Sequence, residues 1–148
     1  MNWRRPLRRA VSVSTPKLGN GVLLDTTVVV QHFRAVNLPL KTFLQTGGTA
    51  YLPLTVLAEL HGGACRVTRK DKALRQIHTF LLTTILLLPD EATAVTYGEI
   101  YAELAKAGTP IPQNDLWIAA QAREHGLPVA TADAHFGRVQ GLTVLDWR

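Results

Sequence analysis

The sequence predicts an α/β protein with a central parallel sheet of about five strands. Two observations lead to this prediction. From Val22 onward, short runs of apolar residues alternate with segments of helical periodicity, an order typical of βαβ units. The apolar runs are also nearly continuous, as expected for strands that helices cover on both faces. With 148 residues, of which 47% are hydrophobic and 18% charged, the chain fits one domain with a substantial core.

Five segments have the composition of buried strands. They span residues 22–25, 49–54, 84–88, 129–132 and 142–145. The longest apolar run, FLLTTILLL at residues 80–88, is interrupted by two threonines and falls far below the roughly 20 residues that a membrane span requires. We therefore interpret this run as buried structure and expect no membrane segment.

Helical character is found in six segments. They span residues 26–34, 40–44, 55–64, 71–82, 91–107 and 112–125. Pro39 breaks the first two apart, Asp90 is a candidate N-cap, and Gly108 and Gly126 end the last two helices. Pro112 suits a first helical turn. In the fifth segment, one stripe is assigned to the core or in part to a subunit interface: Tyr97, Ile100, Tyr101 and Leu104.

The positive charge of the chain is concentrated at its beginning. The net charge is +5, yet the residues before position 20 include five basic and no acidic ones, which leaves 11 residues of each sign in the remainder. We expect residues 1–20 to be a flexible basic leader and residues 21–148 to be the folded domain. The leader also fits a start codon placed too early, an RNA-contacting arm, or less well a transit peptide. A single cysteine, Cys65, excludes an internal disulfide and suits the cytoplasm.

Four acidic residues fall where an α/β sheet binds ligands. Asp25 ends the first strand, Asp133 follows the fourth, Asp115 opens the last helix, and Glu59 lies on the helix after the second strand. Ligands of open α/β sheets bind beyond the carboxyl ends of the strands. Each aspartate also has a simpler explanation, because Asp25 can cap a helix, Asp115 can favour a helix dipole and Asp133 can stabilise a turn.

Carboxylates gathered at one place repel each other unless a cation lies between them. Without a set of Cys or His residues at ligand spacing, an oxygen cluster suits Mg²⁺ or Mn²⁺ better than zinc. Such ions promote the hydrolysis of phosphodiesters. Of the five histidines, His135 stands two residues after Asp133, but we interpret it as structural.

Four segments carry a family resemblance: LLDTTVVV, PLTVLAELHGG, IPQNDLWIAAQAREHGLPVATAD and HFGRVQGLTVLDW. In this order they resemble the PIN-domain ribonucleases, and more closely the VapC-type toxins of type II toxin-antitoxin modules. The resemblance covers the chain from Val22 to Trp147. It implies a three-layer α/β/α PIN fold and a Mg²⁺- or Mn²⁺-dependent endoribonuclease that cuts RNA as a toxin. It also implies neutralisation by a partner antitoxin and a homodimer.

The resemblance assigns roles to the four acids. It implies that Asp25 and Asp115 are direct metal ligands, and that Glu59 and Asp133 bind a second metal or orient the attacking water. Three accessory residues accompany them: Thr131 with a hydroxyl facing the site, Asn114 as a neighbour of the ligands, and Thr27. Thr27 is a departure, because the family commonly has Asn at that position.

Basic residues follow the helix that carries Glu59. They are Arg66, Arg69, Lys70, Lys72 and Arg75. This run fits a solvated helix face or a surface that contacts RNA phosphates.

Two other functions remain open at this point. A haloacid-dehalogenase-like phosphatase also has an aspartate after its first strand, but that family needs a second acid two residues later, where this chain has Thr27. The second alternative is a non-catalytic RNA-binding or interaction module on a PIN scaffold.

Overall fold

The computed structural model describes residues 20–148, so the predicted leader lies outside it except for Asn20. Within residues 20–148, the strands are β1 (Val22–Leu24), β2 (Ala50–Pro53), β3 (Ile85–Leu87), β4 (Val129–Thr131) and β5 (Val144–Asp146). The helices are α1 (Thr26–Phe33), α2 (Leu38–Gln45), α3 (Leu54–Ala64), α4 (Lys70–Leu81), α5 (Glu91–Ala107), α6 (Gln113–His125) and the 3-10 helix η1 (Ala134–Arg138).

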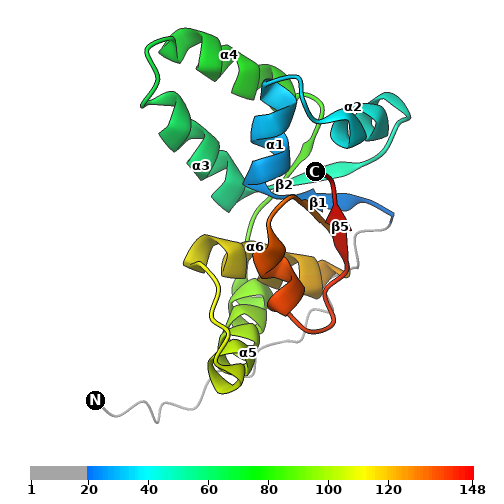
Figure 1. Cartoon of the computed structure of the whole chain (residues 1–148), viewed down its shortest axis with the longest axis vertical. Coiled ribbons are helices and arrows are strands. Elements are labelled where there is room, and N and C mark those ends of the chain that lie inside the picture. Colours follow the sequence, from blue (N-terminus) through cyan, green and yellow to red (C-terminus); the bar gives the residue numbers. More distant parts are fainter. Residues whose placement is uncertain (1–19) are drawn as a thin grey trace.

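All five strands pair in parallel, in the order β3-β2-β1-β4-β5. Helices α1 to α4 lie on one side of this sheet and α5 and α6 on the other (Figure 1). The predicted three-layer α/β/α fold with five parallel strands is therefore confirmed. The core lies on the central strands, where side chains such as Leu23, Leu52 and Val129 are fully buried.

The strand order places a switch point between β1 and β4. From β1 the chain builds the sheet outward through β2 to β3, and it then returns through α5 and α6 to β4 on the other side of β1. Connections that leave neighbouring strands in opposite directions open a crevice at the carboxyl ends of those strands. The residues after Leu24 and after Thr131 face this crevice.

Several predicted helix ends are confirmed by their caps. The side chain of Asp90 accepts a hydrogen bond of 3.1 Å from the backbone N–H of Thr93 and forms a capping box at the start of α5. Gly108 and Gly126 end α5 and α6 with φ angles of 67° and 66°, a left-handed conformation that glycine adopts without strain. Helix α3 ends at Cys65, whose side chain is exposed next to Arg66.

The prediction that Pro39 separates two helices was wrong. Helix α2 begins two residues earlier than predicted, at Leu38, so that Pro39 lies in its first turn. There its missing N–H costs no helical hydrogen bond. The start is set by Asn37, whose Oδ1 accepts the backbone N–H of Leu40 at 2.8 Å.

The prediction that the apolar run at residues 80–88 is buried was only partly right. Phe80 is buried, but Leu82, Ile85 and Leu88 are 81%, 51% and 60% exposed. The reason is that β3 is an edge strand, covered less completely than β1 or β4. In the stripe on α5, Ile100 and Leu104 are buried while Tyr101 is exposed. Among the described helices, none combines the length and the apolar character needed to cross a bilayer.

Candidate active site

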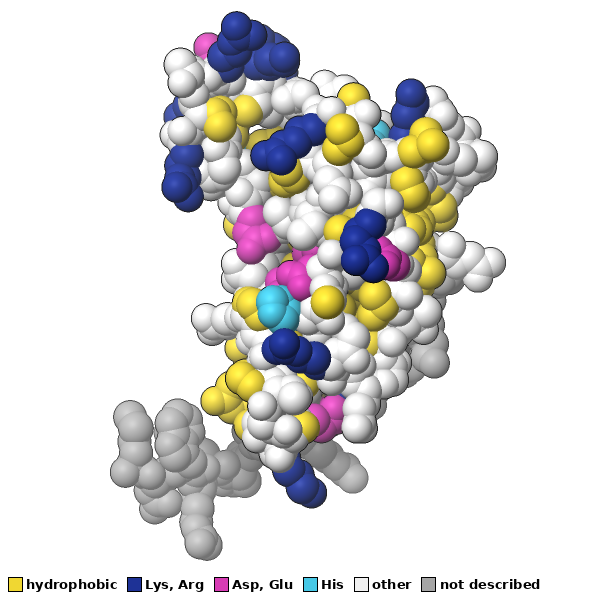
Figure 2. All heavy atoms as spheres, viewed as in Figure 1, with side chains coloured by type: hydrophobic (Ala, Val, Ile, Leu, Met, Phe, Trp, Pro, Cys, Tyr) yellow, Lys and Arg dark blue, Asp and Glu magenta, His cyan; other side chains and the backbone are white. Residues whose placement is uncertain are grey.

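The four predicted acids lie around one pocket at the switch point. Asp25 follows β1 and caps α1, Glu59 lies on α3, Asp115 is in the first turn of α6, and Asp133 follows β4 and caps η1. All four line a pocket of about 540 Å³, together with Thr26, Thr27, Gly62, Gly63 and Arg66. Figure 2 shows the acidic side chains gathered on this face beside a histidine, below the Lys and Arg side chains of the α3–α4 end.

Asp25 is the most enclosed of these acids, with 3% of its surface exposed. Its Oδ1 accepts the backbone N–H of Thr26 at 2.7 Å, which caps α1. Its Oδ2 accepts the hydroxyls of Thr27 and Thr131, each at 2.7 Å. Thr131 therefore lies behind Asp25 and holds it, while its own oxygen accepts the N–H of Asp133 at 2.8 Å. These bonds tie the first and last acids of the site together.

Glu59 is oriented by two side chains from other helices. One carboxylate oxygen accepts the hydroxyl of Thr26, and the other accepts the side-chain amide of Asn114 at 2.7 Å. Gly62 and Gly63 follow on the same face of α3, at the i+3 and i+4 positions. A Cβ atom at either glycine would meet open space in the pocket. Because these two residues have no side chains, the pocket stays open beside Glu59.

Burial and the neighbouring carboxylates change the pKa of Asp115. Partial burial, followed by the charges of Asp25 and Asp133, raises the pKa of its carboxyl to about 6, although nearby His135 opposes the shift. A cation placed among these oxygens would remove the repulsion. The raised pKa is consistent with a crowded group of carboxylates that a bound cation would stabilise.

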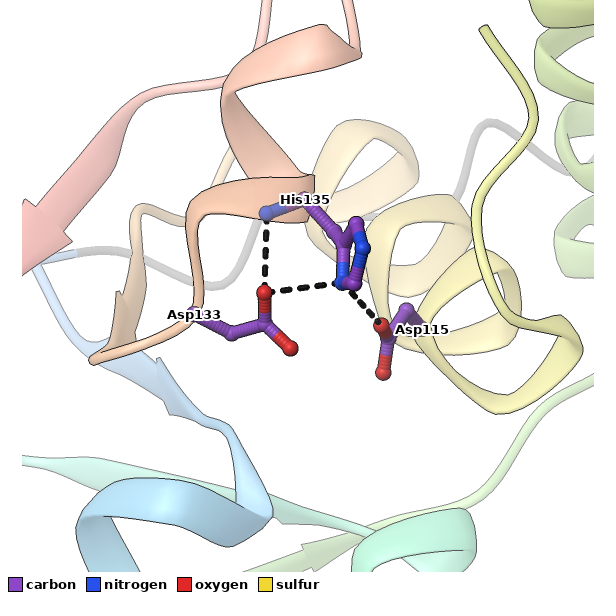
Figure 3. A group of neighbouring side chains, drawn as sticks. All are labelled: Asp115, Asp133 and His135. Carbon is purple, nitrogen blue, oxygen red and sulfur yellow. Dashed lines mark hydrogen bonds and ion pairs between the residues drawn. The ribbon is translucent and has the colours of Figure 1, made fainter.

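Asp133 contacts His135, which we interpreted from the sequence as a structural residue. Burial raises the pKa of this carboxyl, but contacts from the backbone and the ring of His135 outweigh it and, with the charge of Arg138, hold the pKa below its ordinary range. His135 Nδ1 lies 2.8 Å from Asp133 Oδ1 and 3.8 Å from Asp115 Oδ2 (Figure 3).

These donors fit a divalent cation. Within residues 20–148, one group of possible metal-binding atoms lies within 4.8 Å of one another, and it comes from Asp115, Asp133 and His135. The sequence predicted Asp25 as a metal ligand as well; it lines the same pocket, and its oxygens accept hydrogen bonds from the Thr26 backbone and from the hydroxyls of Thr27 and Thr131. The residues that sequence reasoning missed are thus His135, Thr26 and the two glycines. The spacing of Gly62 and Gly63 from Glu59 was a readable signal.

The predicted basic residues separate into two groups. Arg66 lines the acidic pocket itself. The other four line a neighbouring surface depression at the start of α4: Arg69, Lys70, Lys72 and Arg75. A groove connects the pocket with this depression. It is lined by Glu59 and Gly63 from the pocket and by Arg69 and Lys72 from the depression. The acidic pocket therefore opens toward a basic surface.

Comparison with known proteins places these features in a family. Residues 22–142 match the model of the PIN domain. The chain is 32% identical over 127 residues to Ribonuclease VapC2 of Haemophilus influenzae, an alignment covering 84% of this chain and 96% of the relative. It is 33% identical over 129 residues to the tRNA(fMet)-specific endonuclease VapC of Shigella flexneri, with 84% and 96% covered.

Solved structures give the same result. The crystal structure of DNA-bound VapBC from Salmonella typhimurium contains a chain that superposes with a TM-score of 0.78 at 29% identity, covering 86% of this chain and 98% of that one. VapBC2 of Rickettsia felis, bound to a DNA fragment from its promoter, gives 0.77 at 25% identity, with 86% and 98% covered. The parallel sheet, the carboxylates at its switch point and these matches agree, and the chain belongs to the PIN-domain family, among the VapC ribonucleases.

Proposed function

We propose that this protein is a Mg²⁺- or Mn²⁺-dependent endoribonuclease that acts in the cytoplasm as the toxin of a type II toxin-antitoxin module. One observation supports it most: four carboxylates from four separate elements converge on one pocket at the switch point of the sheet. Nucleases of the PIN family generally depend on divalent metal ions. The raised pKa of Asp115 supports a site that needs a cation.

In this proposal Asp25, Asp115 and Asp133 hold the ion, and they line one pocket from the ends of β1 and β4 and the first turn of α6. When bound, the ion supplies charge neutralisation at the scissile phosphate and lowers the pKa of a water molecule. Glu59 orients the attacking water, and Thr26 and Asn114 fix the direction of its carboxylate. Thr27 and Thr131 keep Asp25 in place.

The surroundings of Asp25 disfavour the phosphatase alternative. A nucleophilic aspartate must present a free oxygen to the phosphorus atom. Here Oδ2 accepts two hydroxyls and Oδ1 caps α1, and Thr27 stands where the second acid of that chemistry is needed. A covalent phosphate trapped on Asp25 would reverse this conclusion.

The proposed partners are RNA, an antitoxin protein and a second copy of the chain. Arg66 and the basic residues of α4 would contact RNA phosphates beside the acidic pocket. Self-association is supported by apolar side chains left exposed on β3 and α5, which include Ile85, Val95 and Tyr101. The relatives that carry the name VapBC are complexes, and an antitoxin for this chain is proposed on that basis.

The first test is RNA cleavage with purified protein, using initiator tRNA and total RNA, because one relative is named for tRNA(fMet). We expect cleavage with Mn²⁺ or Mg²⁺, none with EDTA, and a loss of about two orders of magnitude or more in Asp115→Asn. Glu99→Gln, which removes an exposed carboxylate on α5, is the matched control and should retain activity. Cleavage that persists in EDTA would refute the metal-dependent mechanism.

A second test addresses the toxin role. Induced expression in a bacterial host should arrest growth for the wild type but not for Asp115→Asn. Growth arrest by both proteins would instead favour a non-catalytic interaction module, since the acids would then have no part in toxicity.

A further inference from the structure

His135 presents a ring nitrogen to two of the site carboxylates. Figure 3 shows the imidazole directed between Asp115 and Asp133, with Nδ1 on their side. The distances are 2.8 Å from Nδ1 to Asp133 Oδ1 and 3.8 Å to Asp115 Oδ2. The side chain is 38% exposed, yet the Nδ1 atom itself is shielded from solvent.

The Nδ1 atom has no well-aligned hydrogen bond despite this short contact. Asp133 Oδ1 already accepts the backbone N–H of His135 at 2.9 Å. The shielded nitrogen therefore meets the two carboxylate oxygens as ion pairs and has no directed bonding partner. A cation bound by all three atoms would supply one.

The spacing of the three atoms suits coordination. In an octahedral site with metal–oxygen distances of about 2.1 Å, neighbouring ligand atoms are about 3 Å apart. The contacts of 2.8 Å and 3.8 Å on either side of Nδ1 bracket this value. The three ligand atoms therefore need only a small adjustment to share one ion.

The position of His135 is fixed by its local structure. The residue lies in η1, whose start is capped by Asp133. The next residue, Phe136, is fully buried and anchors the turn in the core. Arg138 at the end of the turn donates to the carbonyl of Pro110 at 2.9 Å, next to the segment that leads into α6. These contacts fix the backbone of the turn, and the imidazole lies on the side of the two carboxylates (Figure 3).

We propose that His135 is a metal ligand through Nδ1, together with Asp115 and Asp133, and that this nitrogen favours Mn²⁺ over Mg²⁺. Imidazole nitrogen is a better ligand for first-row transition ions than for Mg²⁺, which prefers oxygen and water. The inference rests on the proposed metal-dependent function and deepens it. It assigns the site a mixed nitrogen and oxygen ligand set.

The test is pulsed electron paramagnetic resonance of Mn²⁺ bound to the whole protein. We expect a ¹⁴N coupling typical of coordinated imidazole in the wild type. In wild-type protein whose histidines are labelled with ¹⁵N, the ¹⁴N coupling must be replaced by a ¹⁵N coupling. This control needs no mutation. The coupling must disappear in His135→Asn and persist in His78→Asn, a control that alters an exposed histidine on α4.

Calorimetric titration gives the second readout. His135→Asn should weaken Mn²⁺ binding by about tenfold and Mg²⁺ binding by less, so the preference for Mn²⁺ falls. If Mn²⁺ binds in a manner that depends on Asp115 but shows no histidine coupling, the His135 ligand is refuted while the metal-dependent function stands. If no Mn²⁺ binds at all, both proposals are refuted.

Discussion

The hydroxyl of Thr27 accepts a hydrogen bond of 3.0 Å from the backbone N–H of Ala132, 105 positions later in the chain. The same hydroxyl donates to Asp25 Oδ2 at 2.7 Å. It therefore connects the end of β1 to the residue that follows β4. The family commonly has Asn at this position, and in this chain a hydroxyl satisfies both a buried acceptor and a backbone donor.

Replacing Thr27 by Val should destabilise the fold by about 1–2 kcal/mol, because the Ala132 N–H and Asp25 Oδ2 each lose a partner. Thr27→Ser keeps the hydroxyl and should unfold close to the wild type. Urea denaturation followed by circular dichroism measures the difference. If the Val variant were as stable as the Ser variant, the hydroxyl of Thr27 would contribute nothing to the free energy of unfolding.

Asp115→Asn should stabilise the metal-free protein at neutral pH. Because folding raises the pKa of this carboxyl from 3.8 to about 6, ionised Asp115 disfavours the folded state. The favourable contribution of its protonated form is complete below pH 3.8 and is lost as the pH rises through 6. The gain from the variant should thus be a few degrees of melting temperature at pH 7.5 in EDTA and should vanish near pH 4. Thermal melts of Asp115→Asn and wild type at the two pH values, with Glu99→Gln as control, test this prediction. An equal gain in melting temperature at both pH values would contradict it.

Asp25→Asn should have the opposite effect, although both residues belong to one cluster. Asp25 accepts three hydrogen bonds, and an amide nitrogen in place of Oδ2 cannot accept the hydroxyls of Thr27 and Thr131. We expect a loss of about 1–3 kcal/mol in the same EDTA buffer. A gain in stability like that of Asp115→Asn would show that repulsion, rather than hydrogen bonding, dominates at Asp25.

Arg66→Ala should weaken RNA binding and reduce its salt dependence. The side chain lines the acidic pocket from the turn between α3 and α4, where it can neutralise one phosphate. The slope of log affinity against log salt should fall by about 0.7 for single-stranded RNA. Fluorescence anisotropy in EDTA separates binding from cleavage. Lys106→Ala, on the exposed end of α5, is the matched control, and an equal effect of the two variants would exclude a specific role for Arg66.

Thr93→Val should destabilise the layer formed by α5 and α6. The hydroxyl of Thr93, which is fully buried, donates to Glu124 Oε2 at 2.6 Å. The side chain of Glu124 is only 5% exposed, and its other oxygen has no hydrogen-bond partner. Removing this donor should cost about 1–3 kcal/mol, while Thr93→Ser should be nearly neutral. Chemical denaturation at pH 7.5 compares the two, and equal midpoints would contradict the assigned role.

Sequence patterns predicted the elements near the site better than those at the edges of the sheet. Around β1 and α1, the apolar run and Asp25 define the structure locally, since a strand ends where its cap begins. Strand β5 starts two residues later than predicted, at Val144, because its pairing with Val129 of β4 sets the register. Register and edge position depend on contacts distant in sequence, which a single-strand pattern does not contain.

The site divides in a similar way. Carboxylates that follow strands can be found from the parallel-sheet rule, and the structure brings Asp25 and Asp133 to one pocket. The contact of His135 with Asp115 could not be predicted in this way, because it depends on the 3-10 turn that directs the ring toward Asp115. The sequence pattern at Ala134 to Arg138 is too short to reveal this turn.

Cys65 gives the molecule a native attachment point for a spectroscopic label. It is the single cysteine of the chain, it is exposed, and it lies one residue before Arg66 at the wall of the acidic pocket. A thiol-reactive fluorophore would therefore attach at one position, within reach of any RNA or antitoxin segment that enters the pocket. Binding could then be followed in real time without introducing or removing a residue.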